Sequence, residues 1–123
     1  AGGLEMPNVL GKLVNNRILA PWQRQELGPK LQTLVASVLS VPGTQAELKP
    51  DEVEVDYVIA SPEACMNGLD MVITIEANQY PERVGRALEF SDAIVELLRR
   101  KALSNIPKDR WYVWVRLAEG GWS

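Results

Sequence analysis

Two stretches with helical periodicity, each lying between two strand-like stretches, constrain the fold of this chain more than any other feature. In the range 21–40, apolar residues recur at spacings of three and four: Leu31, Leu34, Val35, Val38 and Leu39. The range 81–103 repeats this pattern, with Ser91 as its polar interruption: Val84, Ala87, Leu88, Ile94, Val95 and Leu98. Pro21 and Pro81 suit first helical positions. Two helices are therefore predicted, and Gly28–Pro29 predicts a kink or a separate first turn in the earlier one.

Four short stretches predict strands: Asn8–Asn15, Val53–Ile59, Met71–Ala77 and Trp111–Leu117. In the second, Val53, Val55, Tyr57 and Ile59 alternate with other residues, which indicates a strand with one buried face. The third is more uniformly apolar, which indicates cover on both faces.

The resulting order is β-α-β followed by β-α-β, an α/β (α+β) fold of two similar halves. A crossover helix between strands implies parallel pairing within each half. We expect one four-stranded sheet with both helices on one face. The other face needs cover as well, and symmetric packing of further subunits is the common solution.

The chain has 123 residues, enough for one domain with a real core. Residues 1–6 are interpreted as an expression remnant that ends in an initiator methionine, and residues 7–123 as the domain. A net charge of −3 argues against nucleic acid as a partner. The dense basic run Arg99–Arg100–Lys101 falls near the end of a predicted helix, where cations are favoured.

Location and membrane association are predicted from what the sequence lacks. It shows no apolar run long enough to span a bilayer and no signal peptide. A single cysteine, Cys65, cannot form an internal disulfide. We therefore expect a cytoplasmic protein with no membrane partner.

The sequence contains no histidine, which narrows the possible chemistry. Catalysis by Ser-His-Asp or Cys-His groups and histidine-ligated metals are excluded, and one cysteine is too few for a thiolate zinc site. No metal or organic cofactor is expected. A general base would have to be a carboxylate, a lysine, a tyrosine or the chain's own amino terminus.

Four short motifs, in order along the chain, resemble the tautomerase superfamily, which includes 4-oxalocrotonate tautomerase and macrophage migration inhibitory factor. Met6–Pro7 opens directly into a strand, as in family members whose amino-terminal proline is exposed when the methionine is removed. Arg17 stands ten residues further on, at the offset of a substrate-binding arginine of the oxalocrotonate tautomerases.

The other two motifs are similar to macrophage migration inhibitory factor. Lys49–Pro50 leads into the second strand, where that family member has an active-site lysine. The range 106–113 resembles its approach to the last long strand, which puts Tyr112 where a tyrosine lines a neighbouring subunit's pocket. Trp114 stands in place of an asparagine, which changes the polarity of the pocket wall, and the factor's Cys-x-x-Cys is absent.

The resemblance implies a tautomerase or isomerase that moves a proton on small 2-oxo acids, as a homotrimer with sites between subunits. Pro7 would be the general base, Arg17, Lys49 and Tyr112 would bind the substrate, and Trp114 would form a pocket wall. Family members also carry out dehalogenation or hydration. With six residues before it, Pro7 has its nitrogen in an amide, so this form is expected to be inactive.

Two alternatives remain open at this point. The same oligomeric scaffold could be a non-catalytic module that binds a small ligand or a partner, because a fold does not determine a function. The element order also fits a ferredoxin-like sandwich that dimerises through its sheet.

Overall fold

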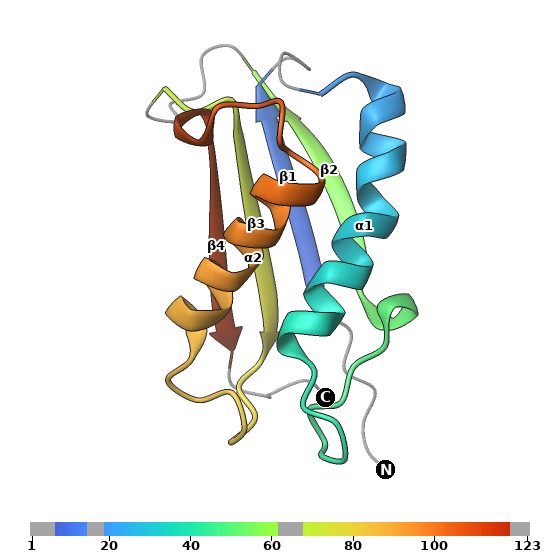
Figure 1. The fold of residues 1–123 in the computed structure, drawn as a ribbon, viewed down its shortest axis with the longest axis vertical. Helices are drawn as coiled ribbons and strands as arrows, with labels where there is room; N and C mark the ends of the chain where they lie inside the picture. The colour runs from blue at the N-terminus through green and yellow to red at the C-terminus, as the bar shows by residue number, and fades with distance from the viewer. Residues whose placement is uncertain (1–6, 15–18, 62–67, 119–123) are drawn as a thin grey trace.

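The computed structural model describes residues 7–14, 19–61 and 68–118. The elements, in chain order, are β1 (Asn8–Val14), α1 (Pro21–Leu39), η1 (Pro50–Glu52), β2 (Glu54–Ala60), β3 (Met71–Asn78), α2 (Ala87–Lys101), η2 (Lys108–Arg110) and β4 (Trp111–Ala118). The strands form one sheet in the order β2-β1-β3-β4, and both helices lie on one face of it (Figure 1).

Strand pairing confirms the two predicted halves. β1 pairs in parallel with β2, and β3 pairs in parallel with β4, as expected for strands joined by a crossover helix. The halves meet where β1 and β3 pair antiparallel, with Asn8 opposite Glu76 and Leu13 opposite Met71. The starts of β1 and β2 and the ends of β3 and β4 therefore lie at the same end of the sheet.

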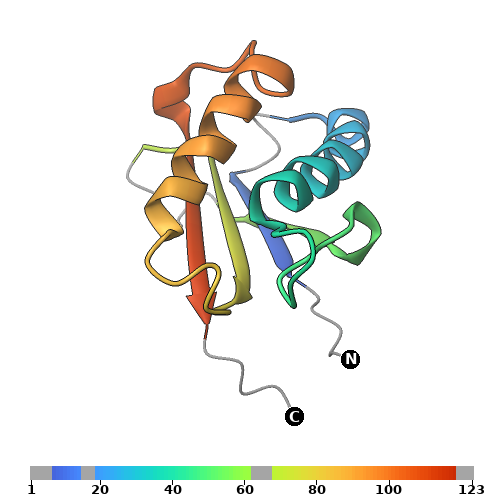
Figure 2. The same cartoon turned by 60° about the horizontal axis from the view of Figure 1, so that its bottom comes forward.

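The core lies between the sheet and the helices. Residues on β3 alternate, with Met71, Ile73, Ile75 and Ala77 buried under the helices. The buried helix positions are Leu27, Leu31, Leu34, Val35, Ala36 and Leu39 on α1, and Phe90, Ile94 and Leu98 on α2. Figure 2 shows both helices on the same side of the strands from a second direction.

Helix α1 runs through Pro29 as one helix, without the separate first turn that the sequence suggested. The residue before the proline is Gly28, which has no Cβ to clash with the proline ring. At the start of the helix, the Gln23 side chain accepts a hydrogen bond from the Ala20 backbone N–H at 2.7 Å.

The predicted start of the second helix at Pro81 is wrong, because α2 begins at Ala87. Gly85 has a φ of 78°, a left-handed conformation that cannot continue a right-handed helix. Val84 lies before the helix and is exposed, and Leu88, expected in the buried stripe, is 74% exposed. Phe90 occupies the core position instead.

Strand β2 is an edge strand, which explains why its alternation predicts burial only in part. Val53, just before it, is buried, and Val55 and Tyr57 are half-buried. Ile59 was expected on the buried face but is 44% exposed.

The face of the sheet opposite the helices is open in the single chain. It carries exposed or half-buried apolar side chains from all four strands: Leu10, Val58, Val72, Tyr112 and Trp114. Charged residues share it, including Glu76 and Arg116, whose side chains approach to 3.7 Å.

Candidate functional site

Pro7 stands directly before β1 and is buried. Its carbonyl oxygen accepts a hydrogen bond from the Glu54 backbone N–H at 2.9 Å, which ties it to the start of β2. A proline fits the first position of a strand because it has no N–H to give to the ladder. The residue predicted to be the base therefore lies at a defined end of the sheet.

Lys49 lies at the same end. It precedes η1, which leads directly into β2, and β2 runs parallel to β1. Its backbone is held by Glu52, whose carboxylate accepts from the Lys49 N–H at 2.8 Å and whose own N–H donates to the Lys49 carbonyl at 3.0 Å. Its side chain is exposed. The structure thus brings together the ends of the chain segments that carry Pro7 and Lys49.

A buried arginine that sequence reasoning missed holds this end of the molecule together. Arg83, in the loop between β3 and α2, is fully buried. Its guanidinium donates from Nε to the Leu39 carbonyl at 3.1 Å, from Nη1 to the Asn78 carbonyl at 3.2 Å and from Nη2 to the Ala46 carbonyl at 3.2 Å. It also lies 5.4 Å from the centre of the Tyr80 ring. One cation therefore joins the end of α1, the loop that follows it and the end of β3.

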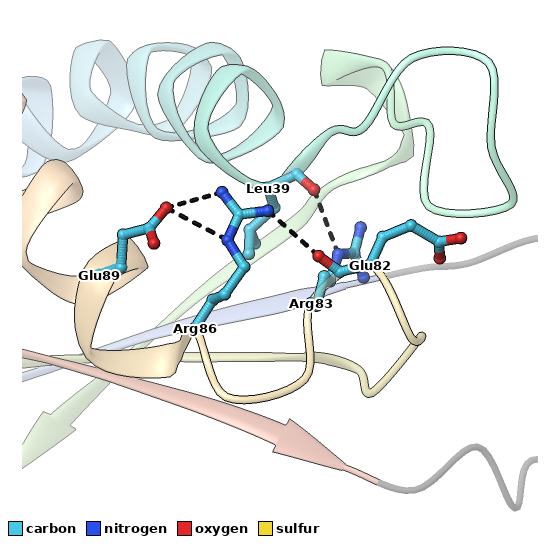
Figure 3. A network of polar contacts seen from close by, with 5 residues as sticks. All are labelled: Leu39, Glu82, Arg83, Arg86 and Glu89. Carbon is cyan, nitrogen blue, oxygen red and sulfur yellow. Dashed lines mark hydrogen bonds and ion pairs between the residues drawn. The ribbon is translucent and has the colours of Figure 1, made fainter.

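The rest of this loop is ordered by a second arginine (Figure 3). Arg86 donates to the Glu82 carbonyl at 3.1 Å and binds the Glu89 carboxylate at 2.7 Å. The hydrogen bond from Arg86 lowers the pKa of Glu89. Glu82 differs, because its Oε1 is buried and has no hydrogen-bond partner within the described part of the chain.

Tyr112 and Trp114 lie elsewhere in the chain. They are exposed neighbours on the open face of β4, at 44% and 54%, with ring centroids 6.2 Å apart. Tyr112 pairs with Val72, whereas Pro7 is one residue beyond Asn8, which pairs with Glu76. At about 3.3 Å per residue, the rows of Pro7 and Tyr112 are about 17 Å apart along the strands. Within one chain the structure does not bring Tyr112 to Pro7.

Arg17 lies outside the described residues. Within the ranges 7–14, 19–61 and 68–118, no group of three or more acidic, cysteine or histidine side chains is arranged to hold a metal ion. No helix in the described part of the chain has the length and hydropathy needed to cross a membrane.

Chemically, the Pro7 end combines a buried proline, an exposed lysine and a buried guanidinium. A proline nitrogen becomes a base only when it is the chain terminus, since an amide nitrogen carries no basic lone pair. Cations and an apolar surround both disfavour the ammonium form and so lower the pKa of a terminal amine. Such an arrangement can support proton transfer next to a carbonyl group.

Neither a family model nor a curated protein matches this sequence. Solved structures do match its fold. A macrophage migration inhibitory factor-like protein from Entamoeba histolytica has a TM-score of 0.60 at 17% identity, over 96% of this chain and 94% of that one. A fused 4-OT protein in an asymmetric trimer has a TM-score of 0.65 at 12% identity, over 94% of both chains. MIF2 from Leishmania major has a TM-score of 0.59 at 16% identity, over 96% and 94%.

At these identities the likeness shows the fold and leaves the activity open. It agrees with the sheet order, the parallel pairing within each half and the common face for both helices. The chain has the fold seen in the macrophage migration inhibitory factor-like and 4-OT structures.

Proposed function

We propose that this protein is a cytoplasmic tautomerase that moves a proton on small 2-oxo acids, with Pro7 as the general base. The observation that carries the proposal is the position of Pro7. It is the buried residue directly before β1, tied to Glu54 and at the same end as Lys49, in a tautomerase-type fold. The same groups could carry out dehalogenation or hydration on other substrates. Tautomerisation is the reaction to test first.

The proposed chemistry begins with a neutral secondary amine at Pro7. An amino terminus titrates near neutrality, and the cations Arg17 and Lys49 would lower the pKa of the proline ammonium further. The amine would take a proton from the carbon next to the carbonyl and return it at another position. Arg17 would bind the substrate carboxylate, and Lys49 or Tyr112 would stabilise the enolate oxygen.

We propose that the complete site forms between subunits of a homotrimer. The separation of about 17 Å between the rows of Pro7 and Tyr112 supports this, because a neighbouring copy must then supply Tyr112. Trp114, next to Tyr112, would form the pocket wall. The open apolar face of the sheet also favours cover by further copies.

The test is tautomerisation of phenylenolpyruvate, followed by ultraviolet absorbance, with protein whose first residue is verified as Pro7. We expect activity that is lost in Pro7→Ala and absent from the form that keeps residues 1–6. Lys49→Ala should raise KM. Lys30→Ala removes an equal charge from α1 and should leave kcat and KM unchanged. Equal activity in the Pro7→Ala protein or in the extended form would refute Pro7 as the base.

A non-catalytic ligand-binding module is the second candidate, and the exposed Tyr112–Trp114 pair favours it. Two neighbouring aromatic rings offer a surface for an apolar ligand. This function predicts that ligand binding, followed by tryptophan fluorescence, survives Pro7→Ala and is lost in Trp114→Ala. The tautomerase instead predicts that turnover is lost in Pro7→Ala.

A further inference from the structure

A hollow of about 500 Å³ lies between α1 and α2. Every residue that lines it belongs to these helices or directly follows α2, and none belongs to a strand, so it opens on the side of the helices away from the sheet. Its floor is apolar and consists of Pro29 and Leu34 from α1, Leu97 from α2, and Ala102. A hollow of this size and character is typical of a small-molecule site.

Two lysines stand at one end of the hollow. Lys30 comes from α1 and Lys101 from α2, and both also line a second, smaller hollow of about 240 Å³. The two side chains therefore lie where the hollows meet. Both lysines are exposed, and neither makes a hydrogen bond or an ion pair with another residue in the described part of the chain.

The basic run at the end of α2 shows that Lys101 differs from its neighbours. Arg99 and Arg100 both bind the Glu96 carboxylate, each at 2.9 Å. Both guanidinium groups are therefore held by one carboxylate on the helix surface, whereas Lys101 lines the groove. The negative end of the helix dipole favours any cation in the last turn of α2. It does not explain why Arg99 and Arg100 bind Glu96 while Lys101 lines the groove.

We propose that the groove between α1 and α2 binds an amphipathic carboxylate, with its anionic group between Lys30 and Lys101. The alkyl chain would lie over Leu34 and Leu97, which form an apolar floor. Thr33, exposed at the same hollow, can donate a hydrogen bond to the carboxylate. This site is separate from Pro7 and does not depend on the proposed tautomerase activity.

The lining of the second hollow indicates why the alkyl chain would enter the larger hollow instead. It contains the Glu26 carboxylate and amide or hydroxyl groups such as Gln23, Ser104 and Asn105. A negative charge and a polar lining disfavour both an anion and an alkyl chain there. The chain is therefore directed into the larger hollow, and the carboxylate stays at the junction.

Titration calorimetry with decanoate below its micellar concentration tests the proposal, with decan-1-ol and decyltrimethylammonium as matched probes. We expect saturable binding of one decanoate per chain, tighter than either of the other probes. Lys30→Gln and Lys101→Gln should each weaken decanoate affinity about threefold to tenfold. A charge-assisted contact at an exposed site contributes an effect of this size. Glu26→Gln should strengthen decanoate affinity.

Arg100→Gln is the control, since it removes one charge from the same helix turn but from a side chain that binds Glu96. It should leave decanoate affinity unchanged. Thr33 is exposed, so Thr33→Trp should place an indole ring in the groove without disturbing the core. This variant should lose decanoate binding while its circular dichroism spectrum stays native. Equal affinities for decanoate and decan-1-ol, or equal effects of Arg100→Gln and Lys101→Gln, would overturn the proposal. If the native protein binds no decanoate and Lys101→Gln lowers the mass in solution, the proposal is wrong and the groove is a contact between copies.

Discussion

At the scale of single residues, Gly11 in β1 illustrates how a neighbouring side chain decides what a strand position can hold. Gly11 pairs with Tyr57 on β2, and a Cβ added to Gly11 would lie 2.8 Å from Cδ1 of the Tyr57 ring. The Tyr57 hydroxyl donates to the Arg24 carbonyl at 3.2 Å, which holds the ring against α1. We therefore expect Gly11→Ala to lower the free energy of unfolding by about 1–3 kcal/mol, measured by urea denaturation.

The cause of that loss can be separated from the intrinsic preferences of glycine and alanine. In a Tyr57→Val background the ring is absent, so Gly11→Ala should cost much less than it does beside the tyrosine. An equal cost in both backgrounds would mean that the ring does not restrict Gly11.

Tyr57 also predicts how stability changes at high pH. Burial raises the pKa of Tyr57 from 10.0 to about 12, against a smaller lowering by the Arg24 guanidinium. Below pH 10 the phenol is protonated in both the folded and the unfolded chain, so its contribution is fully present. Between pH 10 and about pH 12 only the unfolded chain releases the proton, so stability falls as pH rises.

The comparison is with Tyr57→Phe, which removes this phenol and leaves every other titratable group in place. The urea midpoint of the native protein should fall more steeply with pH above 10 than that of the phenylalanine variant. Parallel curves for the two proteins would contradict a raised pKa at Tyr57.

At the scale of elements, the loop between β3 and α2 depends on Arg83. Its guanidinium serves three carbonyl groups from three segments, and a lysine ammonium cannot reach all of them with one compact charge. We expect Arg83→Lys to cost about 2–4 kcal/mol, because buried carbonyls lose charged hydrogen bonds. Hydrogen exchange should show earlier opening of residues 79–86 than of the strands.

Arg86→Lys is the matched control in the same loop. Arg86 binds Glu89 through side chains that are both substantially exposed, at 41% and 63%. Ion pairs of this kind contribute little to stability, so Arg86→Lys should lower the free energy of unfolding far less than Arg83→Lys does. Similar losses for the two variants would show that burial is not what makes Arg83 important.

Periodicity predicted the elements well where local pattern and tertiary position agree. The four strands, α1, and the Ile94–Leu98 face of α2 all follow from spacing. The start of α2 does not, because the acceptors of Arg83 come from α1 and the loop after it, distant in sequence. Arg83 stood beside apolar positions in the predicted helix, which was the one signal that a cation there needed a buried partner.

The candidate site was predictable to a similar extent. Parallel pairing of the first two strands already puts Pro7 and Lys49 at one end of the sheet. The strand pattern alone did not place Tyr112 relative to Pro7, because it carries no information about which copy a side chain serves, and the expectation of a neighbour's pocket came from the family resemblance alone. Leu88 illustrates the same limit, since it lines a hollow with Tyr112 and Trp114 at the outer strand instead of entering the core.

At the scale of the whole molecule, the open face of the sheet decides whether one chain is enough. Leu10 stands near its centre, between Asp56 on β2 and Thr74 on β3, and points away from the helices. A lysine there leaves the helix-side core untouched but puts a charge where we propose that other copies pack. We therefore expect Leu10→Lys to shift the mass in solution from three chains to one, measured by light scattering, while the circular dichroism spectrum stays native.

The control and the second readout make that experiment decisive. Trp22→Lys also replaces an exposed apolar residue, 61% exposed on α1, but lies on the helix layer and should leave the mass unchanged. If Tyr112 acts on a neighbour's Pro7, a Leu10→Lys monomer that begins at Pro7 should lose tautomerase activity together with its assembly. A folded monomer that keeps full activity would place all the catalytic groups in one chain and refute the shared site. A native mass of two chains would instead favour face-to-face sheets, because only a pair of copies then covers the open face.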